Sequence, residues 1–438
     1  MGQFFSKGQK ISSPSGTEYK IEEFLGEGTQ GEVYRVSSGG KDWALKWYFT
    51  ADATDAQRKS LESLVLKGAP TDKFLWPLEV ISSPNCANFG YIMPLRPKNY
   101  KDLIELMKRT IDPTFHSLCT AGFQLADSFL HLHTQGLAYR DINFKNVFFN
   151  PQNGEVLICD NDNVTFDNAS TSTIGGTPGF MAPEIERGEA RPRTTTDRYS
   201  LAVLLFRMFF IDHPLEGKKE SAIHCFDVIA MKKLYGYDPL FIFDPNDNSN
   251  APDPLYHTNA PIFWEIYPQF FKDLFIKGFT VGLKDPQNGR IMENEWRNAL
   301  LKLRDSIIYC QKCGYENFYD VETMKNSGGM APKCWNCHTA ITPPPRIKID
   351  KLIVMLNYNT KLYPYHLDPF SYDFSQPIAE LSQHPSNPNL WGLKNLTKKS
   401  WQVIKKDGTS LEILSGKNVP IGNGVIINFG RVDGEIRA

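Results

Sequence analysis

The sequence predicts an α+β protein that ends in an all-β domain, and three observations lead to this prediction. Residues 17–95 are rich in β-forming residues, residues 96–305 carry apolar patterns of helical period, and residues 346–438 contain short β runs separated by turn residues. Between the last two, residues 306–342 hold four of the eight cysteines. We therefore expect a large two-part domain over residues 1–305, then a small cysteine-containing unit and a β-sandwich.

Composition and charge limit the classes of function. The 438 residues carry a net charge of −1, which argues against a general nucleic-acid binder or a polybasic membrane-surface protein. The longest apolar stretch, Leu201 to Ile211, is interrupted by Arg207 and is too short for a membrane span. No apolar signal-peptide core follows Met1, so we expect a soluble, cytoplasmic protein. The first residues also fit the acylation pattern around Gly2, and an unmodified Gly2 is the alternative.

The amino-terminal part is expected to contain strands over residues 19–25, 31–36 and 42–48, and a helix over residues 54–68. Gly68 and the nearby Pro70 would end that helix. In the next part, helical periodicity predicts the following helices: 117–134, 197–211 and 295–308.

A glycine-rich turn lies between the first two expected strands. Gly26, Gly28, Gly31 and Val33 fit the pattern G-x-G-x-x-G-x-V. Glycines let the backbone approach phosphate oxygens and donate N–H groups to them. A dinucleotide-binding motif is disfavoured because a strand follows Gly31, whereas a hairpin without function remains an alternative.

Further motifs follow in a fixed order. They are Trp43-Ala44-Leu45-Lys46; Tyr139-Arg140-Asp141-Ile142-Asn143-Phe144-Lys145-Asn146; Leu157-Ile158-Cys159-Asp160; Gly176-Thr177-Pro178 through Ala182-Pro183-Glu184; and Asp197-Arg198-Tyr199-Ser200-Leu201. In order and spacing, residues 17–305 resemble the eukaryotic-type Ser/Thr protein kinases, in the form found in bacteria. The resemblance implies a two-lobed fold, with lobes over about 17–95 and 96–305, that uses ATP with Mg²⁺ or Mn²⁺ to phosphorylate protein hydroxyls.

The resemblance also assigns roles to single residues. Lys46 would bind the α- and β-phosphates, with Glu62 as its carboxylate partner on the helix; a solvated Glu62 is the alternative. Asp141 would accept the proton of the substrate hydroxyl, and Asn146 and Asp160 would bind the metal.

Other roles concern nucleotide binding and structure. The residues expected around the nucleotide are Gly26, Gly28, Gly31, Val33, Ala44, Lys46, Met93, Leu95, Asn146 and Asp160. Pro94 has no N–H, so a hinge donor to adenine must be a neighbour. Glu184 should pair with Arg290, and Asp197 should hold the backbone of the loop that contains Asp141.

The motifs depart from the family at three places. Tyr139 replaces a histidine, and Asn143 stands where Ser/Thr kinases have a lysine. We expect Lys145 to supply that positive charge, and an exposed lysine without function is the alternative. Asp160-Asn161-Asp162 replaces Asp-Phe-Gly, so an apolar plug is missing and Asp162 is an added carboxylate for metal binding.

An active enzyme is favoured because Lys46, Asp141, Asn146 and Asp160 are all present. An ATP-binding pseudokinase scaffold is the main alternative. A small-molecule kinase is disfavoured by the segment from Gly-Thr-Pro to Ala-Pro-Glu. Candidate autophosphorylation sites are Thr165, Ser170, Thr171, Ser172 and Thr173, with ordinary loop polarity as the alternative.

The four clustered cysteines form two C-x-x-C pairs. Cys310 and Cys313 are separated from Cys334 and Cys337 by the residues 314–333. This spacing predicts a zinc ribbon over 306–342 with one structural Zn²⁺. A redox role is disfavoured because neither pair lies in a βαβ setting.

The tail from residue 346 resembles the last half of a forkhead-associated β-sandwich, through residues 390–397 and 422–430. Ser382 and His384 lie near one another but lack the preceding Gly-Arg of that family's phosphothreonine site. We therefore expect a degenerate docking or regulatory module. Kinases with such tails are similar to signalling components that work with a phosphatase and an adhesion-type domain.

Overall fold

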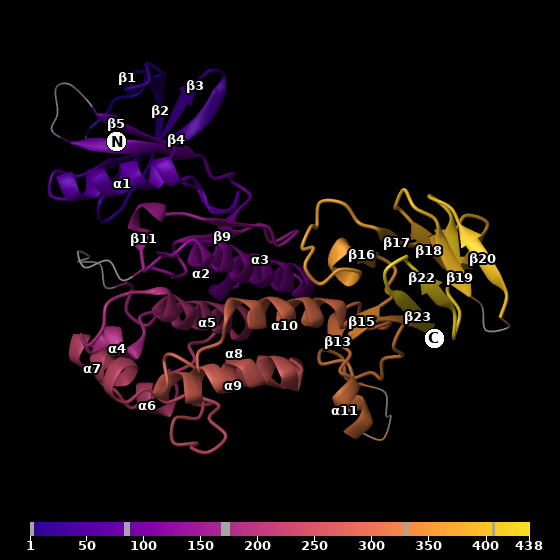
Figure 1. The fold of residues 1–438 in the computed structure, drawn as a ribbon. Helices are drawn as coiled ribbons and strands as arrows, with labels where there is room; N and C mark the ends of the chain where they lie inside the picture. Colours follow the sequence, from indigo (N-terminus) through magenta and orange to yellow (C-terminus); the bar gives the residue numbers. More distant parts are fainter. Residues whose placement is uncertain (1–3, 83–87, 168–175, 327, 329–331, 405–407) are drawn as a thin grey trace. The chain divides into compact units, whose positions relative to one another are not determined.

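The computed structural model describes residues 4–438 except 83–87, 168–175, 327, 329–331 and 405–407 (Figure 1). Gly2 and the sites Ser170 to Thr173 therefore lie outside the described residues. The chain divides into two compact units: the first comprises Met1–Trp264 and Lys272–Asn298, and the second comprises Glu265–Phe271 and Ala299–Ala438. Among the described helices, none is both long and apolar enough to cross a bilayer.

The first unit begins with an antiparallel sheet of six strands in the order β1-β2-β3-β4-β6-β5. Its strands are β1 (Lys10–Ser12), β2 (Glu18–Glu27), β3 (Gly31–Ser38), β4 (Lys41–Tyr48), β5 (Glu79–Ser82) and β6 (Phe89–Pro94). Three of them confirm the strands expected from the sequence. Gly31 is required at the start of β3, because a Cβ there would lie 2.1 Å from the Trp47 carbonyl oxygen of β4.

Helix α1 (Asp55–Lys67) lies beside this sheet (Figure 1). Thr54 caps its start by accepting a hydrogen bond from the Gln57 N–H, and Gly68 ends it with a φ of 77°. The helix buries Leu61 and Leu64, which fixes the face that it turns inward.

The next part of the chain is mainly helical, as expected. Its helices are α2 (Leu103–Met107), α3 (Phe115–Thr134), α4 (Pro183–Glu186), α5 (Thr194–Phe210), α6 (Lys218–Ser221), α7 (Val228–Lys232), the π-helix η2 (Lys233–Tyr237), α8 (Asn259–Ile266), α9 (Gln269–Lys284) and α10 (Glu293–Asp305). Helices α3 and α5 pack together within the first unit, and most residues of α3 are buried. They form the support for the loops described next.

Short strands position two loops of this part. The strands are β7 (Lys101–Asp102), β8 (Leu137–Ala138), β9 (Val147–Phe149), β10 (Val156–Ile158) and β11 (Thr165–Phe166), with the 3₁₀ turn η1 (Asn161–Asn163) between the last two. Val147 of β9 pairs with Ile158 of β10. Asn146 and Cys159 therefore flank the same end of this hairpin, and the Cys159 N–H donates to the Asn146 carbonyl at 2.9 Å.

The second unit contains the cysteine pairs and the tail. Its elements are β12 (Ile307–Tyr309), β13 (Glu316–Phe318), α11 (Val321–Asn326), β14 (Arg346–Ile349), β15 (Leu352–Met355), β16 (Lys361–Leu362), η3 (Pro364–His366), β17 (Ala379–His384), β18 (Asn387–Asn395), β19 (Trp401–Ile404), β20 (Ser410–Ile413), β21 (Asn418–Pro420), β22 (Ile426–Asn428) and β23 (Asp433–Arg437). Strands β14 to β23 form a six-stranded and a four-stranded sheet, which share one apolar core around Leu393 and Trp401. The all-β tail is therefore confirmed.

Candidate active site

The loop between β8 and β9 presents Asp141. Its Oδ1 accepts a hydrogen bond from the Thr177 hydroxyl at 2.7 Å, and its Oδ2 accepts one from Asn146 Nδ2 at 3.1 Å. The preceding residue, Arg140, has a positive φ of 75°, a strained conformation that is typical of functional loops. Both oxygens of Asp141 are thus oriented by fixed donors.

Asn143 stabilises this loop from inside. Its side chain is buried and donates to the Asp141 carbonyl at 3.1 Å and to the Thr177 hydroxyl at 3.0 Å, while its Oδ1 accepts from the Lys145 N–H at 2.8 Å. Asn143 therefore has a structural role where the family has a lysine. Lys145 is exposed, so its expected role toward a phosphate stays a prediction.

The second loop, after β10, presents Asp160 with a left-handed backbone at φ 50° and ψ 41°. Desolvation by the surrounding protein raises the pKa of Asp160, although 42% of its side chain is exposed; the Lys46 charge opposes this rise, and the carboxylates of Asp162 and Asp141 add to it. The negative charges of Asp162 and Asp141 thus disfavour the charged form of Asp160. A carboxylate oxygen such as those of Asp160 is a ligand that suits a hard divalent cation. Asn146 and Asp160 come from adjacent ends of β9 and β10, as the metal-binding prediction requires.

The structure shows that the prediction for Glu62 is wrong. Glu62 is half exposed and pairs with Arg58 on the same helix, with Nε and Oε1 3.4 Å apart. Position 62 follows the buried Leu61, and successive residues of a helix point about 100° apart, so Glu62 faces away from the sheet. Gln57, one turn before Leu61, takes the inward position and donates to the Tyr48 hydroxyl at 3.1 Å.

The carboxylate partners of Lys46 among the described residues come from the second loop. Lys46 Nζ lies 2.8 Å from Asp162 Oδ2 and 3.4 Å from Asp160 Oδ1. Burial alone would lower the pKa of Lys46, but the charges of Asp162 and Asp160 outweigh it and the pKa is raised. Nζ also lies 3.4 Å from Gln30 Oε1 of the glycine-rich turn. Lys46 is therefore a buried, permanently charged group between the turn and the second loop.

The residues expected around adenine lie in one hydrophobic cluster. Ala44 and Met93 are opposite one another on β4 and β6, and Val33 and Leu95 pack against the same cluster. In the turn itself, the Gly28 N–H donates to the Gly31 carbonyl at 2.9 Å. These apolar side chains therefore form a surface next to the glycine-rich turn, which directly precedes Val33.

Two buried ion networks confirm expectations. Asp197 accepts hydrogen bonds from the N–H groups of Tyr139 and Arg140, at 2.6 and 2.9 Å. Arg290 Nη2 lies 2.7 Å from Glu184 Oε2, with 2% of the arginine side chain exposed. Asp197 therefore holds the backbone of the loop that contains Asp141, and Arg290 with Glu184 forms a buried structural pair elsewhere in the first unit.

Comparison with known proteins agrees with this geometry. The sequence model of the protein kinase domain family matches residues 19–255, which make up more than half of the chain. The chain belongs to the protein kinase family. Over 218 residues it is 27% identical to protein kinase C delta type of Rattus norvegicus, covering 47% of this chain and 31% of that protein. A probable serine/threonine-protein kinase of Dictyostelium discoideum is 24% identical over 215 residues, or 49% of this chain and 13% of that protein.

Shorter matches are closer in identity. Protein kinase C-like 1 of Candida albicans is 35% identical over 97 residues, which cover 21% of this chain and 9% of that protein. The kinase therefore spans less than a third of the length of these relatives.

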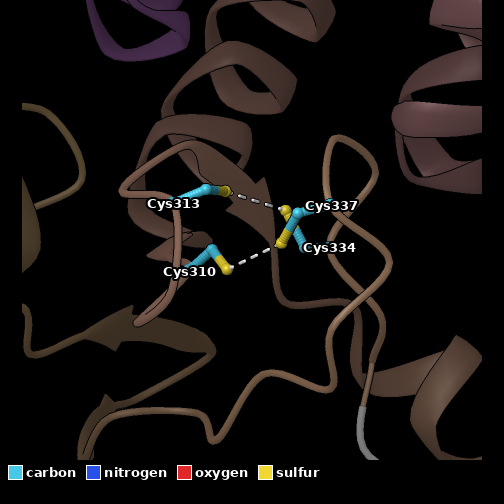
Figure 2. A group of neighbouring side chains, drawn as sticks. All are labelled: Cys310, Cys313, Cys334 and Cys337. Carbon is cyan, nitrogen blue, oxygen red and sulfur yellow. Dashed lines mark hydrogen bonds between the residues drawn. The ribbon is translucent and has the colours of Figure 1, made fainter.

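The four clustered cysteines of this kinase form a candidate metal centre in the second unit (Figure 2). Sγ of Cys310 lies 3.6 Å from Sγ of Cys337, the same separation joins Cys313 and Cys334, and all four sulfurs lie within 4.8 Å of one another. A tetrahedral zinc with bonds of about 2.3 Å separates its sulfurs by about 3.8 Å, so the four thiols fit Zn²⁺ and are too far apart for disulfides. Asn317 Nδ2 donates to Cys334 Sγ at 3.6 Å, and a bond of this kind orients a thiolate that binds a metal.

Sequence reasoning missed several residues of the kinase site. Gln30, Tyr48 and Gln57 surround Lys46 and its partners, and Asp162 serves Lys46 instead of only adding a metal ligand. Gln57 precedes the apolar Leu61 by one helical turn, so the two residues lie on the same face of α1. This spacing was a signal in the sequence that Gln57 faces inward. Asp162 was expected only as an added carboxylate for metal binding. Its contacts with Lys46 and Tyr48 leave no comparable signal in the sequence, because these residues meet only in the folded chain.

Proposed function

We propose that this protein kinase is an active Ser/Thr kinase that transfers the ATP γ-phosphoryl group to protein hydroxyls. One observation carries the proposal: Asp141 is held at both oxygens, by Thr177 and by Asn146. A carboxylate fixed in this way can accept the proton of a substrate hydroxyl and orient it for in-line attack. Lys46 and a divalent cation on Asn146 and Asp160 would neutralise the phosphate charge.

Each neighbour has a defined part in this proposal. The glycine-rich turn would cover the phosphates, and Val33, Ala44, Met93 and Leu95 would contact adenine. Lys145 would approach the transferred phosphate. The Gly-Thr-Pro segment around Thr177 favours Ser or Thr as the acceptor.

Turnover with radiolabelled ATP and a general protein substrate tests the proposal. We expect Asp141→Asn to lose activity by about 10³-fold or more, since it removes the general base and keeps the size of the side chain. Asp72→Asn is a matched control, because the Asp72 side chain is 84% exposed and lies next to Lys73. Equal labelling by wild type and Asp141→Asn would instead support the scaffold alternative, in which ATP is bound without turnover.

We also propose that Cys310, Cys313, Cys334 and Cys337 hold one structural Zn²⁺ as a zinc ribbon. The sulfur separations support this proposal, and so does the small apolar cluster of Cys310, Cys334, Ile308, Ile341 and Met355, which is too small to stabilise the segment alone. Protein purified without chelators should contain about one zinc per chain. Cys334→Ser should lose the metal and Cys225→Ser, an exposed cysteine outside the cluster, should keep it; metal-free wild-type protein would contradict the proposal.

For the tail, we propose a degenerate forkhead-associated module that docks a partner or regulates the kinase in the cytoplasm. Ser382 and His384 both lie on β17, and the Ser382 hydroxyl already donates to Asn418 Oδ1 at 2.8 Å. A phosphatase and a protein with an adhesion-type domain are the proposed partners. Calorimetric titration with phosphothreonine peptides should show no binding in the submicromolar range, and binding there would contradict a degenerate site.

A further inference from the structure

We propose that Asp162 is the positioning residue of Lys46 and replaces the helix carboxylate that this family uses for that purpose. The inference rests on the proposed phosphoryl transfer, because positioning of Lys46 matters only if Lys46 binds phosphates. In protein kinases an ion pair between this lysine and a glutamate of the neighbouring helix must form for activity. Here α1 presents Gln57 on its inward face, and Glu62 points away.

The contacts of Asp162 are those of a fixed counter-ion. Its side chain has no exposed surface, and its Oδ2 accepts hydrogen bonds from Lys46 Nζ at 2.8 Å and from the Tyr48 hydroxyl at 2.5 Å. Tyr48 is in turn held by Gln57 Nε2 at 3.1 Å, and the same Nε2 lies 3.4 Å from the Asp162 carbonyl. A buried carboxylate persists only when it is paired and hydrogen-bonded; Asp162 Oδ2 meets both conditions, whereas Asp162 Oδ1 is buried without a hydrogen-bond partner among the described residues.

Asp160 has a different environment. Its side chain is 42% exposed and lies farther from Lys46, at 3.4 Å. The left-handed backbone at Asp160 begins η1, and this turn directs Asp162 toward β4. The two carboxylates therefore have different roles: Asp160 is accessible to a cation, whereas Asp162 is enclosed by Lys46 and Tyr48.

This arrangement has a consequence for regulation. The counter-ion of Lys46 lies two residues after the proposed metal ligand, on the same loop, and not on a helix. Moving Glu62, or changing the charge of α1, should therefore leave Lys46 in its position. The pair should instead respond to changes in the loop from Asp160 to Asn163.

The experiment compares three single variants and one double variant of the full chain. Asp162→Asn removes the charge at constant size, Glu62→Gln is the matched control on α1, and Gln57→Glu offers a carboxylate on the inward face. ATP affinity is measured by titration calorimetry, kcat and KM are measured by radiolabel transfer, and thermal melting verifies that each variant folds. All measurements are repeated over a range of Mg²⁺ concentrations.

We expect Asp162→Asn to weaken ATP binding by about tenfold or more and to lower kcat by about 100-fold. Glu62→Gln should change neither by more than about twofold. Combining Asp162→Asn with Gln57→Glu should restore at least part of the ATP affinity, because the new carboxylate lies beside Tyr48 in the same cluster. The Mg²⁺ concentration for half-maximal activity should be the same in Asp162→Asn as in wild type.

Several results would overturn the inference. A large rise in the Mg²⁺ requirement of Asp162→Asn would make Asp162 a metal ligand. If Glu62→Gln has an effect as large as that of Asp162→Asn, then Glu62 of α1, and not Asp162, positions Lys46. Unchanged ATP affinity in folded Asp162→Asn would remove the role altogether. If the wild-type chain binds ATP without transferring phosphate, the proposed function fails, and the affinities alone still decide the role of Asp162.

Discussion

His133 Nδ1 of α3 lies 2.6 Å from Glu293 Oε1 of α10, and its Nε2 lies 3.2 Å from Asp197 Oδ2 of α5. The imidazole thus stands between two carboxylates, with 4% of its side chain exposed. Burial alone would lower the pKa of His133, but the hydrogen bonds to Asp197 and Glu293 raise it to about 9. His133 is therefore a charged group at neutral pH, and it holds the aspartate that holds the loop of Asp141.

The raised pKa of His133 predicts a stability that depends on pH. The group gains a proton on folding, so its contribution is complete below its ordinary pKa of 6.5 and is lost as the pH rises through about 9. We expect His133→Gln to lower the free energy of unfolding by at most about 3 kcal/mol at pH 6, and by much less at pH 9.5. Thermal melting across this range measures the difference, with the exposed His384→Gln as control. A difference that stays constant with pH would show that His133 is neutral.

Arg290 offers a test of the pair with Glu184. Arg290 also donates to the Thr195 carbonyl at 2.9 Å, so its removal leaves a partly buried carboxylate and a carbonyl without their partner. We expect Arg290→Ala to destabilise the first unit by about 3–5 kcal/mol. Arg437→Ala breaks the exposed pair with Glu435 and should cost less than about 1 kcal/mol. Similar shifts of the melting temperature in the two variants would argue against a buried structural pair.

Replacing the glycines of the glycine-rich turn by alanine should lower the thermal stability by different amounts. Gly31→Ala places a Cβ against the backbone of β4, 2.1 Å from an oxygen atom, so the strands must separate. At Gly26 a Cβ would meet nothing within 4 Å. We expect Gly31→Ala to lower the melting temperature by several degrees and Gly26→Ala to leave it nearly unchanged, which differential scanning fluorimetry can measure. Equal stability of the two variants would mean that β3 and β4 do not approach as closely as described.

Thr177 predicts an effect on rate without an effect on folding. Thr177→Val removes the hydroxyl that orients Asp141 and keeps the shape of the side chain, so kcat should fall by about 10- to 100-fold. Thr177→Ser keeps the hydroxyl and should retain most of the activity. The melting temperatures of both variants should be close to that of wild type. A valine variant as active as the serine variant would show that Asn146 alone suffices to orient Asp141.

The sequence predicted those parts of the site that depend on order along the chain. Strands β9 and β10 are adjacent in sequence and pair with each other. This hairpin brings the loop before β9, which contains Asp141 and Asn146, next to the loop after β10, which begins with Asp160. The partners Glu184 and Arg290 were also predicted, since family motifs fix both positions. The three strands expected over residues 19–25, 31–36 and 42–48 and the all-β tail followed from β-forming runs and turn residues, whereas the order of strands in the sheets was not predicted.

The partner of Lys46 was not predictable in the same way. The choice between Glu62 and Gln57 depends on the rotation of α1, which the burial of Leu61 and Leu64 decides. The pairing of Asp162 with Lys46 and Tyr48 further depends on the left-handed turn at Asp160. A local pattern carries no information on such a contact, because the contact joins β4 to a loop more than one hundred residues later.

Tyr139 joins the two loops that carry the chemistry. Its N–H donates to Asp197, and its hydroxyl donates to the Cys159 carbonyl, directly before Asp160. The side chain is completely buried and packs edge-on against Phe129 of α3. Because one rigid ring spans the loops, the separation of Asp141 from Asp160 is governed by the length of a tyrosine, and a shorter residue at position 139 would let that separation fluctuate.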